Sequence, residues 1–91
     1  MKDLKIKPDS QLGTLMSHFL GGGFVSHEIA YSLGIGRLAQ RMQDLKNKFL
    51  DADEENPLRT KTIETGGKKK FSVYWLRNQG CEYDKTDWRE F

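Results

Sequence analysis

The stretch that decides the fold is Val25–Phe49, which reads VSHEIAYSLGIGRLAQRMQDLKNKF. Its first part predicts a short helix, because Ser26 is a suitable N-cap and apolar residues follow it at helical spacing. These residues are Ile29, Ala30 and Leu33. Gly34 comes directly after them, where a helix end needs a residue that tolerates left-handed dihedral angles. The break Gly34-Ile35-Gly36 therefore separates two helices.

The second helix is predicted to have one apolar and one polar face. Its apolar residues recur at steps of four, three and four, which places them in one narrow stripe at about 100° per residue. They are Leu38, Met42, Leu45 and Phe49. The opposite face carries amide side chains, and one flank is basic. The opposite face, called the front below, consists of Gln40, Gln43 and Asn47. The basic flank consists of Arg37, Arg41 and Lys48. Such a pattern is typical of a helix-turn-helix whose second helix reads a DNA groove.

The composition fits one small domain. With 91 residues, of which 36% are hydrophobic, the chain has enough material for a single core and no second domain. No apolar run approaches the roughly 20 residues of a membrane span, and the N-terminus lacks the apolar core of a signal peptide. The single cysteine, Cys81, rules out an internal disulfide framework. We therefore expect a cytoplasmic protein with no membrane partner.

The formal net charge is only +2, but the charges are segregated along the chain. Acidic residues concentrate in 51–55 and in 82–90, whereas basic residues concentrate in the second helix and in the run Lys68-Lys69-Lys70. The total charge is therefore compatible with a basic face.

A further helix is predicted before this stretch, beginning after Asp9 or Ser10 and ending at the glycines 21–23. Its apolar residues are Leu12, Leu15, Met16, Phe19 and Leu20. Residues 1–9 are interpreted as a basic N-terminal arm or a short edge strand, and the alternative is a frayed terminus. Phe24-Val25 is long enough only for a two-residue strand.

The chain after the helices predicts a hairpin. Residues 58–65 are rich in threonine and alternate in character, Gly66-Gly67 is a hairpin turn that Lys68–Lys70 extend, and residues 71–76 form a return strand. Three helices followed by a hairpin is the order of a winged helix. The lysines would then lie at the tip of the wing.

The return strand is apolar on both faces. Tyr74 and Leu76 point to one side, and we expect them to enter the core. Phe71, Val73 and Trp75 point to the other side and also need a cover. Two covers are compatible with the sequence: the C-terminal tail, which carries Tyr83, Trp88 and Phe91, or a second copy of the chain. We favour the homodimer, because two-fold symmetric operators match two-fold symmetric proteins.

The helix motif resembles that of the small winged helix-turn-helix proteins of bacteriophages and prophages. Those proteins share a G-hydrophobic-x-R-L-A-x-R-hydrophobic-x-D-L-(K/R) helix, a short wing strand, and a return strand with a Tyr-x-Leu-like end. The matching residues are Gly34, Ile35, Arg37, Leu38, Ala39, Arg41, Met42, Asp44, Leu45, Lys46, Tyr74 and Leu76. The older repressor pattern fits less well, since Gln40 and Gln43 stand where it expects apolar residues.

The resemblance covers about Leu12 to Arg77 and implies an α+β winged helix-turn-helix with three helices and a C-terminal β-hairpin wing. The expected organisation is an N-terminal arm (1–9), the winged helix-turn-helix domain (10–77) and a C-terminal tail (78–91). The implied function is sequence-specific binding of double-stranded DNA in the cytoplasm of a bacterial host. The protein would be a phage or prophage transcriptional regulator or an excisionase-like architectural factor.

The chemistry of the expected site follows from its residue types. Arginine can donate two hydrogen bonds to guanine, and glutamine or asparagine can pair with adenine. The expected DNA-binding residues are Ser26, Gly36, Arg37, Gln40, Arg41, Gln43, Asn47, Lys48, Lys68, Lys69 and Lys70. Two alternatives stay open. The basic flank could form only salt bridges with Asp44, or the chain could be an adaptor that binds a host protein through its apolar wing face and acidic tail.

Catalysis is not expected. His18, His27 and Cys81 lack the spacing of metal ligands, and no pair of carboxylates lies in a predicted cleft. The acidic run 51–55 lacks the alternating ligands of a calcium loop. We therefore predict no cofactor and no metal.

Overall fold

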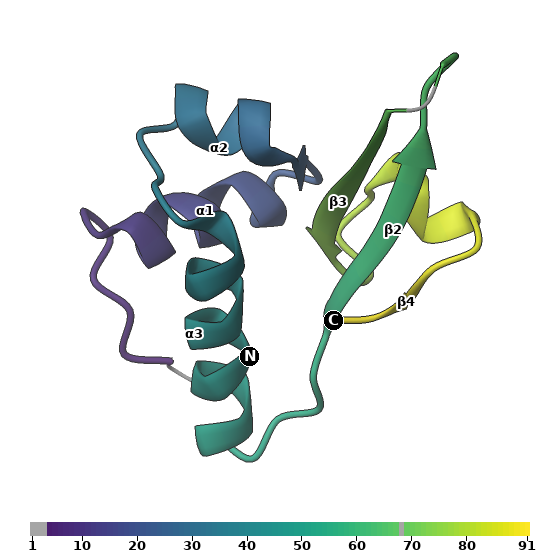
Figure 1. The fold of residues 1–91 in the computed structure, drawn as a ribbon. Coiled ribbons are helices and arrows are strands. Elements are labelled where there is room, and N and C mark those ends of the chain that lie inside the picture. Colours follow the sequence, from purple (N-terminus) through teal and green to yellow (C-terminus); the bar gives the residue numbers. More distant parts are fainter. Residues whose placement is uncertain (1–3, 68) are drawn as a thin grey trace.

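The computed structural model describes residues 4–67 and 69–91 (Figure 1). The described chain forms three α-helices, a four-residue 3-10 helix and one antiparallel sheet with strand order β1-β3-β2-β4. The elements are α1 (Gln11–Leu20), β1 (Phe24–Val25), α2 (His27–Ser32), α3 (Leu38–Asp51), β2 (Leu58–Glu64), β3 (Lys70–Leu76), η1 (Glu82–Lys85) and β4 (Arg89–Glu90). The α+β class predicted from the sequence is confirmed, and so are the positions of the three helices and of β1, β2 and β3.

Local sequence explains where the helices begin and end. The Ser10 hydroxyl accepts a hydrogen bond from the Gly13 N–H at 3.1 Å, and the Ser26 hydroxyl caps α2 in the same way. Gly34 has a φ of +78°, a left-handed conformation that glycine adopts without strain, and it lies two residues beyond α2. Arg37 is also left-handed, with φ 54° and ψ 58°, and precedes α3 without a side-chain cap. The chain therefore turns sharply between α2 and α3.

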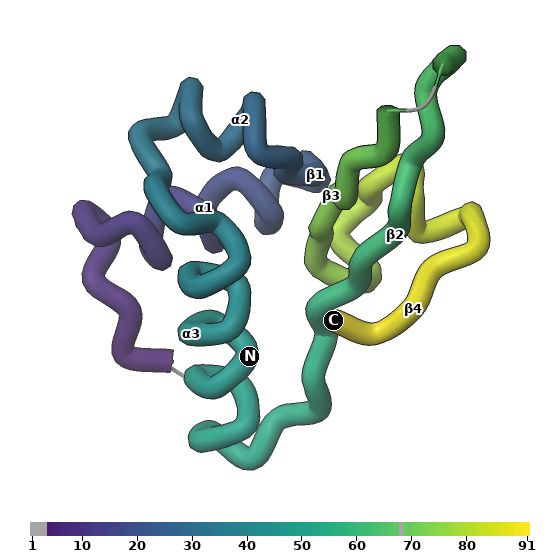
Figure 2. Tube along the Cα trace, viewed as in Figure 1, coloured from purple at the N-terminus to yellow at the C-terminus, as the bar shows by residue number. Residues whose placement is uncertain are grey.

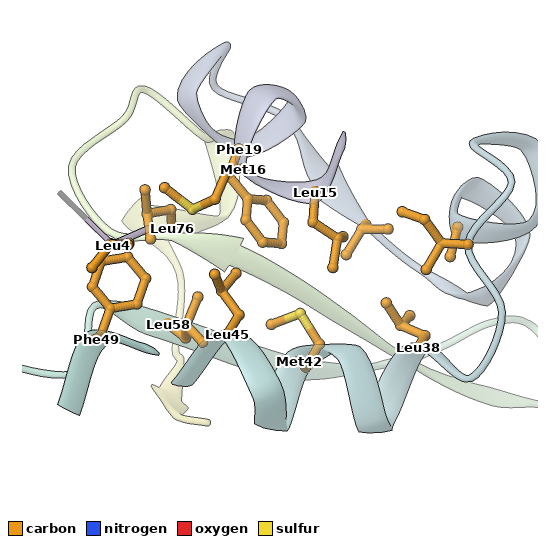
Figure 3. Packing of buried hydrophobic residues seen from close by; sticks show 13 residues of the cluster. Leu4, Leu15, Met16, Phe19, Leu38, Met42, Leu45, Phe49, Leu58 and Leu76 are labelled. Atoms are coloured by element: carbon orange, nitrogen blue, oxygen red, sulfur yellow. The ribbon is translucent and has the colours of Figure 1, made fainter. Parts of the chain in front are cut away.

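The main core lies between the helices and one face of the sheet. All four residues of the α3 stripe are at most 2% exposed, as predicted, and they pack against α1 and the sheet (Figure 3). The core residues labelled in the figure are Leu4, Leu15, Met16, Phe19, Leu38, Met42, Leu45, Phe49, Leu58 and Leu76. Leu20 departs from the prediction for α1, because half of its side chain stays exposed.

The N-terminal arm is attached to this core from Leu4 onward. Leu4 is 9% exposed and Ile6 packs against the cluster, so the described arm is not a frayed end. No strand forms in residues 4–9. A Cβ on Gly13 would come within 2.7 Å of the Pro8 carbonyl oxygen and still closer to that of Lys7. The arm therefore requires a glycine at this position of α1. Residues 1–3 of the predicted arm lie outside the described residues.

Part of the second face of the sheet is covered by the same chain. Tyr74 and Leu76 pack in the main core as predicted, while Val73 and Trp75 are fully buried on the opposite side. Cys81 and Tyr83 cover them, with the rings of Trp75 and Tyr83 5.6 Å apart. In Figure 2 the chain after β3 runs on the side of the sheet away from the helices. Phe71, the third apolar residue predicted for this face, remains 38% exposed, so the tail covers Val73 and Trp75 but not Phe71.

The tail is arranged differently from our expectation. Phe91 packs against Tyr74 on the helix side, with ring centroids 5.4 Å apart, rather than against Trp75. Trp88 stacks on the guanidinium of Arg59 at 4.4 Å. The strand β4 was not predicted, and it pairs with Arg59 and Thr60 of β2. Arg89 and Glu90 of the predicted tail consequently belong to the sheet.

Candidate nucleic-acid interface

The front of α3 is open to solvent, as the helical spacing predicts. Gln40, Gln43, Asn47 and Arg37 are exposed, and Gly36 lies exposed in the turn before the helix. The apolar back of α3 is locked in the core, so the direction in which this front points is fixed. The geometry therefore presents a row of amides on successive turns of a rigid helix.

The polar side chains of the front are already hydrogen-bonded to each other. Gln40 Nε2 donates to Asp44 Oδ1 at 2.9 Å, and Gln43 Nε2 donates to Asn47 Oδ1 at 3.2 Å. Both pairs join residues four positions apart, which are neighbours on a helix surface. These hydrogen bonds orient the Gln40 and Gln43 amides on the helix surface.

The basic flank divides into different environments. Arg41 Nη1 lies 3.4 Å from Asp44 Oδ2, which is one of the salt bridges that the alternative interpretation of this helix expects. Its Nε is buried with no hydrogen-bond partner within the described part of the chain. Lys48 is half-buried beside Leu4 and Lys5 of the N-terminal arm. Arg37 is exposed.

Lys46 is a basic residue near the front that the sequence prediction omitted from the site. Its Nζ lies 5.9 Å from the centroid of the Phe91 ring, toward the tail, whereas Lys48 lies toward the N-terminal arm. The front of α3 thus has a cation on each side. Lys46 and Lys48 are two positions apart, which separates them by about 200° around the helix axis. This spacing could have predicted from the sequence that they lie on opposite sides of the front.

The hairpin brings its lysines close to the start of α2. Lys69 and Lys70 are exposed, and Lys70 Nζ pairs with Glu64 at 3.1 Å. A groove of about 650 Å³ separates this end of the hairpin from α2. It is lined by Ser26, His27, Glu28, Thr65, Lys69, Lys70 and Phe71. Lys68 lies outside the described residues.

Ser26 has a structural task at the edge of this groove. Its side chain is 8% exposed and its hydroxyl accepts the Ile29 N–H. The structure therefore brings Ser26, Lys69 and Lys70 together, while the α3 front and its basic flank form a separate row.

Residues 4–67 and 69–91 contain no group of three or more His, Cys, Asp or Glu side chains placed to hold a metal ion. The same residues contain no helix long and apolar enough to cross a membrane. Burial raises the pKa of the Cys81 thiol above its ordinary value of 9.0, which disfavours a reactive thiolate at neutral pH.

Comparison with protein-family models, with curated proteins and with solved structures gives no match to this chain. A functional proposal must therefore rest on the geometry and chemistry of the chain itself.

Proposed function

We propose that this chain is a sequence-specific double-stranded DNA-binding protein of the winged helix-turn-helix type. The observation that carries the proposal is the exposed, ordered row of amide and guanidinium groups on α3, whose back is fixed in the core. Three helices followed by the β2–β3 hairpin are the winged-helix order, and this order supports the same proposal.

In this proposal α3 enters the major groove, which at about 12 Å is wide enough to admit a helix. Arg37, Gln40 and Gln43 face base edges, where guanidinium and amide groups discriminate between bases. Arg41, Lys46 and Lys48 contact phosphates, which position the protein without reading sequence. The wing, formed by the β2–β3 hairpin with Lys68–Lys70, contacts a neighbouring stretch of the DNA backbone. A phage or prophage transcriptional regulator, or an excisionase-like architectural factor, would use such a module.

The competing function is an adaptor that binds a host protein through its apolar wing face. On that face Val73 and Trp75 are covered by Cys81 and Tyr83, which leaves Phe71 as its exposed apolar residue. Glu82, Asp87 and Glu90 of the tail are exposed, and DNA binding does not explain them.

Salt dependence of binding tests the proposal directly. The affinity for a random-sequence duplex, measured by fluorescence anisotropy, should fall steeply with salt, because each phosphate contact releases counterions. Selection from a randomised duplex pool should then return a preferred site. Failure to bind any duplex at low salt would contradict the proposal, and binding with no dependence on salt would contradict the proposed phosphate contacts.

A further inference from the structure

Asp44 lies on the helix that we propose reads DNA, although its negative charge repels phosphates. Both of its carboxylate oxygens are used. Oδ1 accepts the hydrogen bond from Gln40 Nε2 at 2.9 Å, and Oδ2 lies 3.4 Å from Arg41 Nη1. The two contacts fix one amide of the reading front and one guanidinium of the basic flank. A single carboxylate thus determines how two DNA-facing side chains are presented.

We infer that Asp44 is a positioning residue that makes Gln40 a reader of adenine. This inference rests on the proposed DNA-binding function. The Gln40 amide nitrogen carries two hydrogens, and Asp44 can accept only one of them. The second hydrogen and the carbonyl oxygen remain available as a donor and an acceptor.

The pair of groups left on Gln40 matches one base in particular. Adenine presents the N7 acceptor and the N6 donor in the major groove, which are complementary to that pair. Guanine presents two acceptors, N7 and O6, so the Gln40 carbonyl oxygen would face a second acceptor. An amide held by Asp44 therefore favours adenine over guanine, whereas a freely rotating amide could turn both hydrogens toward guanine.

The same carboxylate also reduces sequence-independent binding. Its charge partly neutralises Arg41 and weakens the attraction to phosphates that every DNA sequence offers. Discrimination depends on the difference between affinities, so weaker binding to wrong sequences raises specificity. Asp44 acts on specificity through both contacts.

The first test measures discrimination in Asp44→Ala, a change that alanine's high helix propensity makes safe for α3. The affinities for the selected duplex and for a random duplex are measured at one salt concentration. Affinity for random DNA should rise, and the ratio of the two affinities should fall by about tenfold. Simple unfolding would lower both affinities, which separates it from the expected result.

Asp51→Ala is the matched control, because it removes the same charge from the last residue of α3. Both affinities should rise alike and their ratio should stay constant. If Asp44→Ala behaves in the same way as Asp51→Ala, the carboxylate contributes only charge and the inference is wrong.

The second test identifies the base. Each adenine of the selected duplex is replaced in turn by 7-deazaadenine, which lacks the N7 acceptor. One replacement should weaken binding of the native chain by about tenfold and leave binding of Gln40→Ala unchanged. If no adenine is coupled to Gln40, the inference fails while DNA binding stands. If the native chain binds no duplex at all, the proposed function fails as well.

Discussion

Asp84 connects the tail to the sheet through both oxygens of its carboxylate. Oδ1 accepts a hydrogen bond from the indole Nε1 of Trp75 at 2.6 Å, and Oδ2 accepts one from the backbone N–H of Asn78 at 2.8 Å. Trp75 is fully buried, so its indole N–H has no access to water. The second bond stabilises the turn at Asn78, whose φ of 64° is left-handed. One side chain therefore satisfies a buried donor and fixes a strained turn.

Replacing Asp84 with alanine should destabilise the protein by about 1–3 kcal/mol, because a buried donor would lose its acceptor. The free energy of unfolding is measured by urea denaturation followed by circular dichroism. Asp87→Ala is the control, since Asp87 is exposed in the same tail. Equal stabilities of the two variants would show that the bond to Trp75 contributes nothing to the fold.

At the scale of elements, the β2–β3 hairpin extends well beyond its neighbours in the sheet. β1 pairs only with Tyr74 and Trp75, and β4 pairs only with Arg59 and Thr60. Seven residue pairs join β2 to β3, and the four from Lys61 to Glu64 continue beyond the outer strands toward the turn. The end that carries the lysines thus projects away from the outer strands, where it can approach a partner without obstruction.

Replacing Lys68, Lys69 and Lys70 with alanine should reduce the slope of log affinity against log salt, by up to about 0.9 for each phosphate that these lysines neutralise in the native complex. The slope is measured with the duplex found by selection. Lys85→Ala serves as the control, because Lys85 belongs to η1, which lies on the side of the sheet away from the helices. An unchanged slope in the hairpin variant would mean that the hairpin end faces away from DNA.

At the scale of the whole molecule, the sheet separates two apolar clusters. The larger cluster is shared with the helices, and the smaller one consists of Val73, Trp75 and Cys81 with the rings around them. Phe91 belongs to the larger cluster although Cys81 belongs to the smaller one. The tail therefore crosses from one side of the sheet to the other around the outer edge of β2, and it holds the two layers together.

Reactivity of Cys81 reports whether this tail is closed. The thiol is buried and its pKa is raised, so iodoacetamide should alkylate the native chain more slowly than the urea-unfolded chain, by about tenfold or more at equal pH. Cys81 is the single cysteine, which makes the readout unambiguous. Tyr83→Ala should accelerate the reaction by opening the cover. Equal rates for native and unfolded chains would contradict the closed tail.

The raised pKa of Cys81 makes the stability of the fold depend on pH in the alkaline range. Burial raises the thiol pKa in the folded state, so the unfolded chain releases this proton first as the pH rises. The contribution of Cys81 to stability is therefore present below the ordinary pKa of 9.0 and decreases above it. Cys81→Ala should lose this part of the alkaline decrease in stability.

The helices could be predicted from the sequence because each signal is local. Apolar spacing identified the α3 stripe, and the caps at Ser10 and Ser26 are formed by the residues predicted. The tail could not be predicted, since η1 and β4 are short and follow no apolar period. Buried Arg59 is a second example, because an arginine in a strand normally indicates a solvent-facing position. Its burial is explained by the stacking of Trp88 and by Nη1, which donates to the backbone carbonyls of Asn56 and Leu58.

In the candidate site, too, some features follow from local sequence and others depend on distant contacts. Which residues of α3 are exposed follows from helical geometry, and Gln40, Gln43 and Asn47 are exposed as predicted. That Lys46 faces the tail and Lys48 faces the N-terminal arm depends on contacts with distant parts of the chain. No local sequence pattern contains that information.

The crossing of the tail has a consequence for synthesis on the ribosome. Translation delivers the three helices and the hairpin before residues 81–91 emerge, so a nascent chain that ends earlier has no cover for Val73 and Trp75. The outer edge of β2 is also unpaired until β4 arrives. During that interval the polypeptide exposes apolar side chains and an unpaired strand edge, which are the features that chaperones bind. Folding of the sheet is completed only when residues 81–91 have been translated.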